Sequence, residues 1–229
     1  MNVKYVIFAG IMRKVGNFVI GFIAVLCLAG CRSSKEESEA LRSGDLLFVE
    51  IPADYTLGTG SEKGFASGAL NIHVAIFDVD EDGTWIVDAT IKRGVARYPF
   101  EDFKTDFTLN DGSLPRFTVK RPSVSAAQAN SFVQNARGYI GQPYDVDFTE
   151  DNGAMYCSEL VYHSYVTSDG RYLFEEGPIS FKGADGQIPQ YWKDIFAWLG
   201  KDIPEGNIGI MPSDMIEDSD LETVNVNNL

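Results

Sequence analysis

From about residue 44 the chain alternates short runs of β-prone apolar residues with polar turns, and helical periodicity begins only later. Runs rich in Val, Ile, Leu and Phe predict strands over residues 45–51, 73–79, 85–91, 95–99 and 116–120. The segment Asp80-Glu81-Asp82-Gly83 separates two of these runs and is typical of a hairpin turn. Because most links are short, an antiparallel sheet is favoured over a parallel one.

Three helices are predicted in the second half of the chain. Apolar residues recur at helical spacing over 129–140, and Ser125 with Gln128 resembles a capping box before them. Two more helices are predicted over about 156–167 and about 190–199. The predicted fold class is therefore α+β, an antiparallel sheet or partial barrel packed against helices.

The amino terminus has the pattern of a secretory signal. An acid-free stretch with three basic residues leads into the apolar run 15–30, which is short for a membrane span. The sequence Leu28-Ala29-Gly30-Cys31 resembles the bacterial lipoprotein cleavage signal, which implies that Cys31 becomes the lipid-bearing first residue. An ordinary cleaved signal and a signal anchor are the alternatives, and translation from Met12 would still give a complete signal.

The remaining chain suits one folded domain behind a linker. Of the 229 residues, 45% are hydrophobic and 23% are charged, a composition that excludes a disordered or fibrous protein. Residues 31–42 are polar and charged, and we predict a flexible tether there. Residues 43–229 are predicted to form the domain, with an acidic tail that is packed at its start near Asp214 and frayed at its end.

The net charge of the chain limits the kinds of partner that it is expected to bind. Loss of residues 1–30 removes three basic groups and no acid, so the net charge falls from −14 to −17. So acidic a chain is not expected to bind nucleic acid, or an anionic membrane by electrostatics. A lipid on Cys31 would supply membrane association instead. We expect a monomer in the cell envelope, lipid-anchored on the periplasmic or cell-surface face.

Cys157 is the first candidate for chemistry, because it is the only cysteine after residue 31. It lies at the start of a predicted helix, after the glycine-containing loop 149–153. Unpaired N–H groups at a helix start stabilise an anion, so a thiol there is biased towards thiolate. The alternative is a small buried apolar residue, since free cysteine is among the most buried types.

A thiolate nucleophile needs an imidazole partner, and the chain has only two histidines. His163 follows Cys157 by six residues, which is about 240° around a helix, so it points away. His73 is then the candidate, although a hydrogen-bonded core histidine is an equal alternative. Glu159 projects to a different helix face from Cys157 and is expected to cap the helix or pair with a cation.

Asp88 is the candidate third member, because a carboxylate within an apolar strand needs a partner. Any hairpin loop of even length after Val79 keeps Asp88 on the same sheet face as His73. A four-residue loop over 80–83 would pair Asp88 with Ala75 and leave His73 as its diagonal neighbour. The two histidines, His73 and His163, are not expected to supply a Cys/His zinc cage, and no metal or organic cofactor is expected.

Six short motifs, taken in order, resemble one family. They are GDLLF at 44–48, HVAI at 73–76, VDA at 87–89, GQPYD at 141–145, YCSELV at 156–161 and MPSDM at 211–215. Together they resemble the permuted papain-like proteins of the NlpC superfamily, and within it the YiiX/YaeF amidase-like group. The resemblance implies a circularly permuted papain-like fold for residues 43–229, because the histidine precedes the cysteine.

The same resemblance implies the roles of the site residues. Cys157 would be the nucleophile, His73 the base and Asp88 the orienting acid, although this group usually has Glu at the last position. Tyr144 matches a family tyrosine near the active site and is a weaker candidate for binding substrate or the oxyanion.

Three functions follow as hypotheses. The first is a cell-envelope cysteine amidase or peptidase that cleaves peptidoglycan peptides or related amides through an acyl-enzyme. The second is a lipid acyl hydrolase or acyltransferase with the same triad, as in the related lecithin:retinol acyltransferase branch. The third is a surface lipoprotein that binds a glycan or a protein without catalysis.

Overall fold

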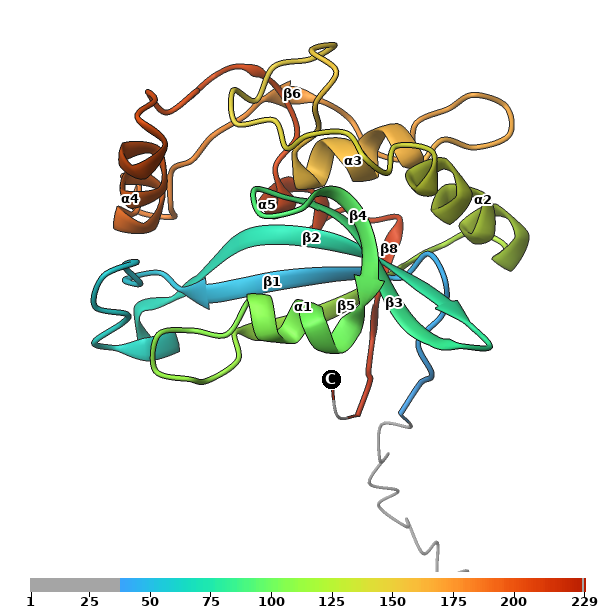
Figure 1. The fold of residues 1–229 in the computed structure, drawn as a ribbon, viewed down its shortest axis with the longest axis horizontal. Helices are drawn as coiled ribbons and strands as arrows, with labels where there is room; N and C mark the ends of the chain where they lie inside the picture. Colours follow the sequence, from blue (N-terminus) through green and yellow to red (C-terminus); the bar gives the residue numbers. More distant parts are fainter. Residues whose placement is uncertain (1–37, 228) are drawn as a thin grey trace, which may run out of the picture. The chain divides into compact units, whose positions relative to one another are not determined.

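The computed structural model describes residues 38–227 and 229, which form a sheet with helices on both faces (Figure 1). Six antiparallel strands lie in the order β4-β3-β2-β1-β5-β8. Their bounds are β1 Leu46–Pro52, β2 Ala69–Asp80, β3 Gly83–Thr90, β4 Gly94–Pro99, β5 Arg116–Pro122 and β8 Leu221–Val224. The strands β6 (Gly177–Pro178) and β7 (Ile208–Gly209) form a separate pair.

The helices cover the two faces of the sheet unequally. Their bounds are α1 Phe100–Asp106, α2 Ala126–Arg137, α3 Cys157–Ser164, α4 Gln190–Leu199 and α5 Pro212–Met215, with a 3₁₀ turn η1 over Gly64–Ser67. In Figure 1, α2, α3 and α5 lie above the sheet and α1 lies on its other side. None of the helices described is long and apolar enough to cross a membrane.

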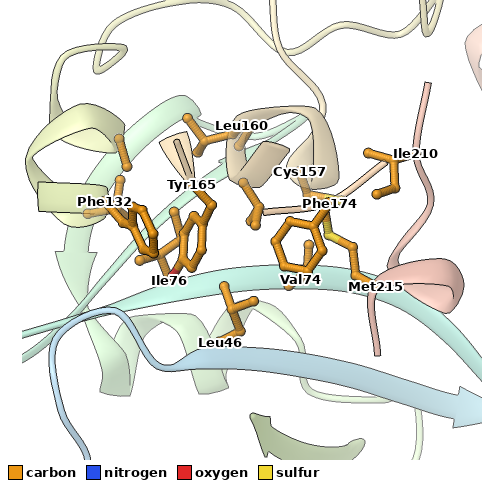
Figure 2. Close-up of a cluster of buried hydrophobic side chains, with 14 of the residues drawn as sticks. Leu46, Val74, Ile76, Phe132, Cys157, Leu160, Tyr165, Phe174, Ile210 and Met215 are labelled. Atoms are coloured by element: carbon orange, nitrogen blue, oxygen red, sulfur yellow. The ribbon is translucent and has the colours of Figure 1, made fainter. Parts of the chain in front are cut away.

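Both faces of the central strands are apolar, so the sheet is buried on both sides. In β1, Leu46 and Phe48 face the core under α2 and α3, whereas Leu47 and Val49 face the core that holds α1. Figure 2 shows the first of these cores, in which Cys157 lies near Val74 of β2. The nucleophile candidate is thus packed directly against the middle of the sheet.

Strand β2 diverges from β3 halfway along its length. The β2–β3 pairing runs from Asp80 opposite Gly83 to Ile76 opposite Val87 and ends there. Residues 69–71 and 73–75 then pair with β1, and residues 88–90 pair with β4. The register of the β1–β2 ladder shifts between Val49 and Glu50, which leaves Ile72 without a partner in β1. This shift marks a β-bulge immediately before His73. The two strands therefore open into a fork at His73 and Asp88.

The structure confirms the α+β class and the antiparallel sheet, which does not close into a barrel. All five predicted strands are present, and α2, α3 and α4 match the predicted helices within a few residues. Ser125 caps α2 by accepting the Gln128 amide N–H at 3.2 Å. The predicted signal peptide lies outside the described residues.

The short elements of the fold were missed, namely η1, α1, β6, β7, α5 and β8. The predicted frayed tail was wrong, because residues 221–224 pair with β5 as the edge strand β8, with Leu221 and Val224 buried. A four-residue strand with two apolar positions carries too weak an alternation to be detected. Helix α1 was also missed, because seven residues span only two helical turns.

The turn between β3 and β4 provides a test of how the fold holds the site. Gly94 has φ +65°, and a Cβ there would lie 2.4 Å from the carbonyl oxygen of Gln142. We expect Gly94→Ala to lower the free energy of unfolding by about 1–3 kcal/mol, through backbone strain and this clash. Gly58→Ala is the matched control, since nothing lies within 4 Å of its Cβ position. Equal thermal unfolding midpoints for the two variants would contradict this account.

Candidate active site

His73 and Asp88 meet at the fork between β2 and β3. The Nε2 atom of His73 lies 2.9 Å from Oδ2 of Asp88, and the two residues are 6% and 1% exposed. The hairpin loop is even, as the sequence predicted, but it has two residues, Glu81 and Asp82, instead of four. The predicted register is observed from Val79 opposite Thr84 to Ile76 opposite Val87, but the ladder ends there, so the predicted pair of Asp88 with Ala75 does not form.

Tyr98 of β4 is a second partner of Asp88 that sequence reasoning missed. Its hydroxyl donates a hydrogen bond of 3.0 Å to Oδ2 of Asp88. Burial, and then the charge of Asp88, raise the pKa of Tyr98, so its hydroxyl remains a donor. The other carboxylate oxygen, Oδ1, is buried and has no partner among the described residues. The pairing of Asp88 with Ala96 makes Tyr98 a near neighbour, but only once the β3–β4 register is known.

Aromatic rings of the α1 region form a wall beside the imidazole. The ring centroid of His73 lies 4.7 Å from that of Phe107 and 5.9 Å from that of Phe103. These rings exclude water from one side of the imidazole and restrict its rotation. Because α1 was not predicted, neither phenylalanine was recognised as part of the site.

Cys157 is the first residue of α3, and 5% of its surface is exposed. Burial alone would raise the pKa of its thiol, but the charge of His73 and a hydrogen bond with it outweigh burial, so the pKa is lowered. The Val74 and Ser158 amide N–H groups lower it further. Because Nε2 of His73 is held by Asp88, Nδ1 is the nitrogen available to the sulfur.

The pKa of the His73 imidazole shifts in the opposite direction to that of the thiol. Burial lowers the pKa of His73, but the charge of Cys157 and hydrogen bonds to Asp88 and Cys157 raise it to about 10. A lowered thiol pKa and a raised imidazole pKa both favour the thiolate–imidazolium pair over the neutral thiol–imidazole pair. The arrangement can therefore supply a nucleophilic sulfur and a proton donor in contact with each other.

Two tertiary hydrogen bonds and one local cap fix the start of α3. The hydroxyl of Ser158 donates to the carbonyl oxygen of Ile210 at 2.7 Å, and the Ile210 N–H donates to the hydroxyl of Tyr156 at 3.2 Å. The Tyr156 amide N–H donates to Oε2 of Glu159 at 3.1 Å, which confirms the predicted capping role of Glu159. His163 lies near Glu159, with Nε2 3.9 Å from Oε1, on a different side of the helix from Cys157.

Tyr144 also lies close enough to Cys157 to respond to its charge. Burial raises the pKa of Tyr144 well above its ordinary value, and the charge of Cys157 raises it further. The pKa of Tyr191 in α4 is raised in the same way, first by burial and then by the charge of Cys157. Both hydroxyls thus remain protonated donors near the sulfur. Tyr191 carried no recognisable signal in the sequence, because its position depends on how α4 packs.

A cavity of about 140 Å³ opens beside His73. Its lining is almost entirely apolar or aromatic, and comes from β2, the end of β3, α4 and the segments near Phe107 and Tyr144. Members of α4 that line it are Tyr191, Trp192, Ile195, Phe196 and Leu199. The structure thus brings Cys157, His73, Asp88 and Tyr144 together beside an apolar cavity, whereas Cys31 lies outside the described residues.

Comparisons with known proteins agree with this arrangement. The family model described as "Permuted papain-like amidase enzyme, YaeF/YiiX, C92 family" matches residues 40–225. The "Uncharacterized protein YiiX" of Escherichia coli strain K12 is 29% identical over 115 residues, which are 49% of this chain and 56% of the relative's length. The aligned region thus spans little more than half of that protein.

A solved structure has the same fold. The crystal structure of the "metalloprotein yiiX" from Escherichia coli O157:H7 superimposes with a TM-score of 0.55 at 19% identity. The match covers 81% of this chain and 97% of that chain.

Alkylation tests the electrostatics of the site directly. We expect iodoacetamide to label Cys157 at pH 6.5 faster than a free peptide thiol, because His73 holds the thiol pKa down. His73→Ala should slow this labelling by about tenfold or more, since each unit of thiol pKa changes the thiolate fraction about tenfold. His163→Ala is the control and should leave the rate unchanged. Equal rates for the wild-type protein and His73→Ala would contradict the ion pair.

Proposed function

Because the chain belongs to the permuted papain-like amidase family YaeF/YiiX, we propose that it is a cysteine hydrolase with Cys157 as nucleophile, His73 as acid–base and Asp88 as orienting acid. The observation that supports this most is the buried series from sulfur to imidazole to carboxylate, in which Asp88 holds Nε2 of His73 at 2.9 Å. A purely structural histidine would not need both a carboxylate and a thiol partner.

The proposed reaction is acyl transfer to sulfur. The Cys157 thiolate attacks the carbonyl carbon of an amide, and the tetrahedral intermediate collapses as Nδ1–H of His73 protonates the leaving nitrogen. An amine leaves and a thioester remains on Cys157. Neutral His73 then accepts a proton from water, which attacks the thioester and releases the acid. Asp88 holds the imidazole in one tautomer throughout.

The oxyanion of the intermediate would be stabilised by N–H groups at the start of α3. Donors of this kind are worth about 3–4 kcal/mol each in comparable sites. The protonated hydroxyl of Tyr144 is a further donor near the sulfur, supported by its raised pKa and its place in the cavity wall. We assign Tyr144 to the oxyanion or to the substrate on this basis.

We place the substrate in the cell envelope, as a peptidoglycan peptide or a related amide. This location depends on the predicted lipid at Cys31, outside the described residues. In the wild-type protein we expect a lipid-modified Cys31 as the first residue, and in Cys31→Ser we expect loss of both the lipid and the cleavage before residue 31, because the same cysteine would direct both. Fractionation followed by mass spectrometry of the amino-terminal peptide measures this. An unmodified Cys31, or an amino-terminal residue other than Cys31, in the wild-type protein would contradict lipid anchoring.

A second substrate class is supported by the apolar cavity. The lining of the cavity beside His73 offers few hydrogen-bonding groups, which suits an acyl chain better than a sugar or a charged peptide. A lipid acyl hydrolase or acyltransferase would use the same three residues. In the acyltransferase, an alcohol or amine would replace water in the second step.

The word metalloprotein in the name of the Escherichia coli structure raises the question of a metal. In the described part of this chain, no group of three or more His, Cys, Asp or Glu side chains is placed to hold a metal ion. The described residues therefore do not fit a metal ion, and the proposed reaction uses the side chains of this chain alone.

Activity assays separate the substrate classes. We expect Cys157→Ala to abolish turnover, and Asp88→Asn to lower kcat by about 10²–10⁴-fold, because an amide cannot fix the imidazole as a carboxylate does. Cell-wall peptides and acyl lipids are assayed side by side, with Cys157→Ala as the blank. Turnover that survives in Cys157→Ala would refute the thiol mechanism.

A carboxylate introduced on α4 tests whether the cavity binds substrate. We expect Ile195→Asp to raise KM by about tenfold or more for a substrate with an apolar group, because a carboxylate in an apolar pocket disfavours that group. Ala197→Asp is the matched control, since Ala197 is exposed on the same helix and does not line the cavity. An equal change in KM for both variants would show that the cavity does not bind substrate.

A further inference from the structure

Glu159 is a buried carboxyl two residues after the nucleophile candidate, and the proposed chemistry does not use it. It is 3% exposed, and Oε2 accepts the Tyr156 amide N–H at 3.1 Å. Its other oxygen, Oε1, has no hydrogen bond among the described residues, and the nearest cation-forming group is Nε2 of His163 at 3.9 Å. Within the described residues the carboxyl therefore caps the helix start through one hydrogen bond, and Oε1 is not among the buried polar atoms that lack a partner.

The surroundings of Glu159 are mostly acidic. Asp145, Glu176 and Glu150 each act on it as negative charges. Asp151 and Glu159 line the same cavity of about 290 Å³, together with Tyr139, Gln142, Met155 and His163. His163 on its own helix is the only possible cation among the residues that line this cavity. A further negative charge at Glu159 would thus be repelled from several directions.

A charge at Glu159 would also oppose the chemistry proposed for Cys157. The start of α3 stabilises the thiolate through the Ser158 N–H, and it would stabilise the oxyanion of the intermediate. An ionised carboxylate at the same helix start would occupy that positive potential and repel both anions. A neutral carboxyl accepts the Tyr156 N–H through its carbonyl oxygen without this cost.

We propose that Glu159 is a positioning residue that works in its protonated form, holding the start of the nucleophile helix while keeping negative charge away from it. This role rests on the proposed function of Cys157. Burial, together with the three acidic neighbours, raises the pKa of Glu159 to about 8, although its bond to the Tyr156 amide lowers it. Glu159 is then neutral at pH 7 and ionises near pH 8.

The protonation state is tested without any substrate. In protein labelled with ¹³C at the glutamate side-chain carboxyl, we expect one resonance to titrate near pH 8 and to disappear in Glu159→Gln. Because the folded pKa is raised, the group stabilises the fold below its ordinary pKa of 4.5 and loses this effect as pH rises to about 8. The wild-type unfolding midpoint should therefore fall relative to that of Glu159→Gln over this interval. A Glu159 resonance that titrates near pH 4–5 would overturn the proposal.

The positioning role is tested on Cys157 itself. Glutamine is a neutral acceptor like the protonated acid, so Glu159→Gln should leave the pH dependence of Cys157 alkylation unchanged below pH 7. Glu159→Ala leaves the Tyr156 N–H without its acceptor, and should slow alkylation at pH 6.5 by about tenfold. Asp151→Ala, in the same cavity, is the matched control and should have no effect. A lower Cys157 pKa in Glu159→Gln would show that Glu159 is ionised, against the proposal.

With a substrate that the protein turns over, the alkaline limb of the pH profile of kcat/KM gives a third measurement. Wild-type kcat/KM should fall above pH 8, as Glu159 ionises, whereas that of Glu159→Gln should persist until His73 loses its proton near pH 10. Identical alkaline limbs would overturn the proposal. The two proposals fail separately: slow alkylation of wild-type Cys157 refutes the proposed function, whereas the carboxyl titration and the Glu159→Gln comparison decide the role of Glu159.

Discussion

The separation of β2 from β3 beyond the pair of Ile76 and Val87 is the constraint on which the site depends. In a continuous sheet, both strands would be hydrogen-bonded at this point and no third element could enter. Because they diverge, His73 and Asp88 face each other across a widening gap, and the Val74 amide N–H is available to the sulfur. The bulge before His73 and the pairing of residues 88–90 with β4 keep the gap open.

Ionisable groups placed in such a gap are stable only as a set. Asp88 is 1% exposed, and its partners are the His73 imidazole and the Tyr98 hydroxyl. Isolated burial would neutralise each group, raising the pKa of the thiol and lowering that of the imidazole. The charge and the hydrogen bond that Cys157 and His73 provide to each other reverse both shifts, so each residue stabilises the charged form of the other. Removing one member therefore changes the charge of the other.

The sequence predicted those parts of the site that depend on local pattern. An even hairpin loop was sufficient to put His73 and Asp88 on one sheet face, whatever its length. The predicted helix put Cys157 at its start, and the helical spacing excluded His163 as the partner of the thiol. Tyr98, Phe107 and Tyr191 reach the site through strand register and helix packing, which are tertiary properties with no local signal. The acidic end of the chain was misread because β8 is stabilised by its partner β5 rather than by its own propensity.

The length of α3 explains why its start needs so much support. Eight residues make just over two turns, so the helix has few internal hydrogen bonds with which to hold its first residue in place. Its start is fixed instead by Ser158, Tyr156 and Glu159, two of which bind the Ile210 backbone just before α5. The segment 210–215 thus acts on the sulfur from the far end of the chain. In this permuted order, residues on both sides of the cysteine along the sequence determine where the thiolate points.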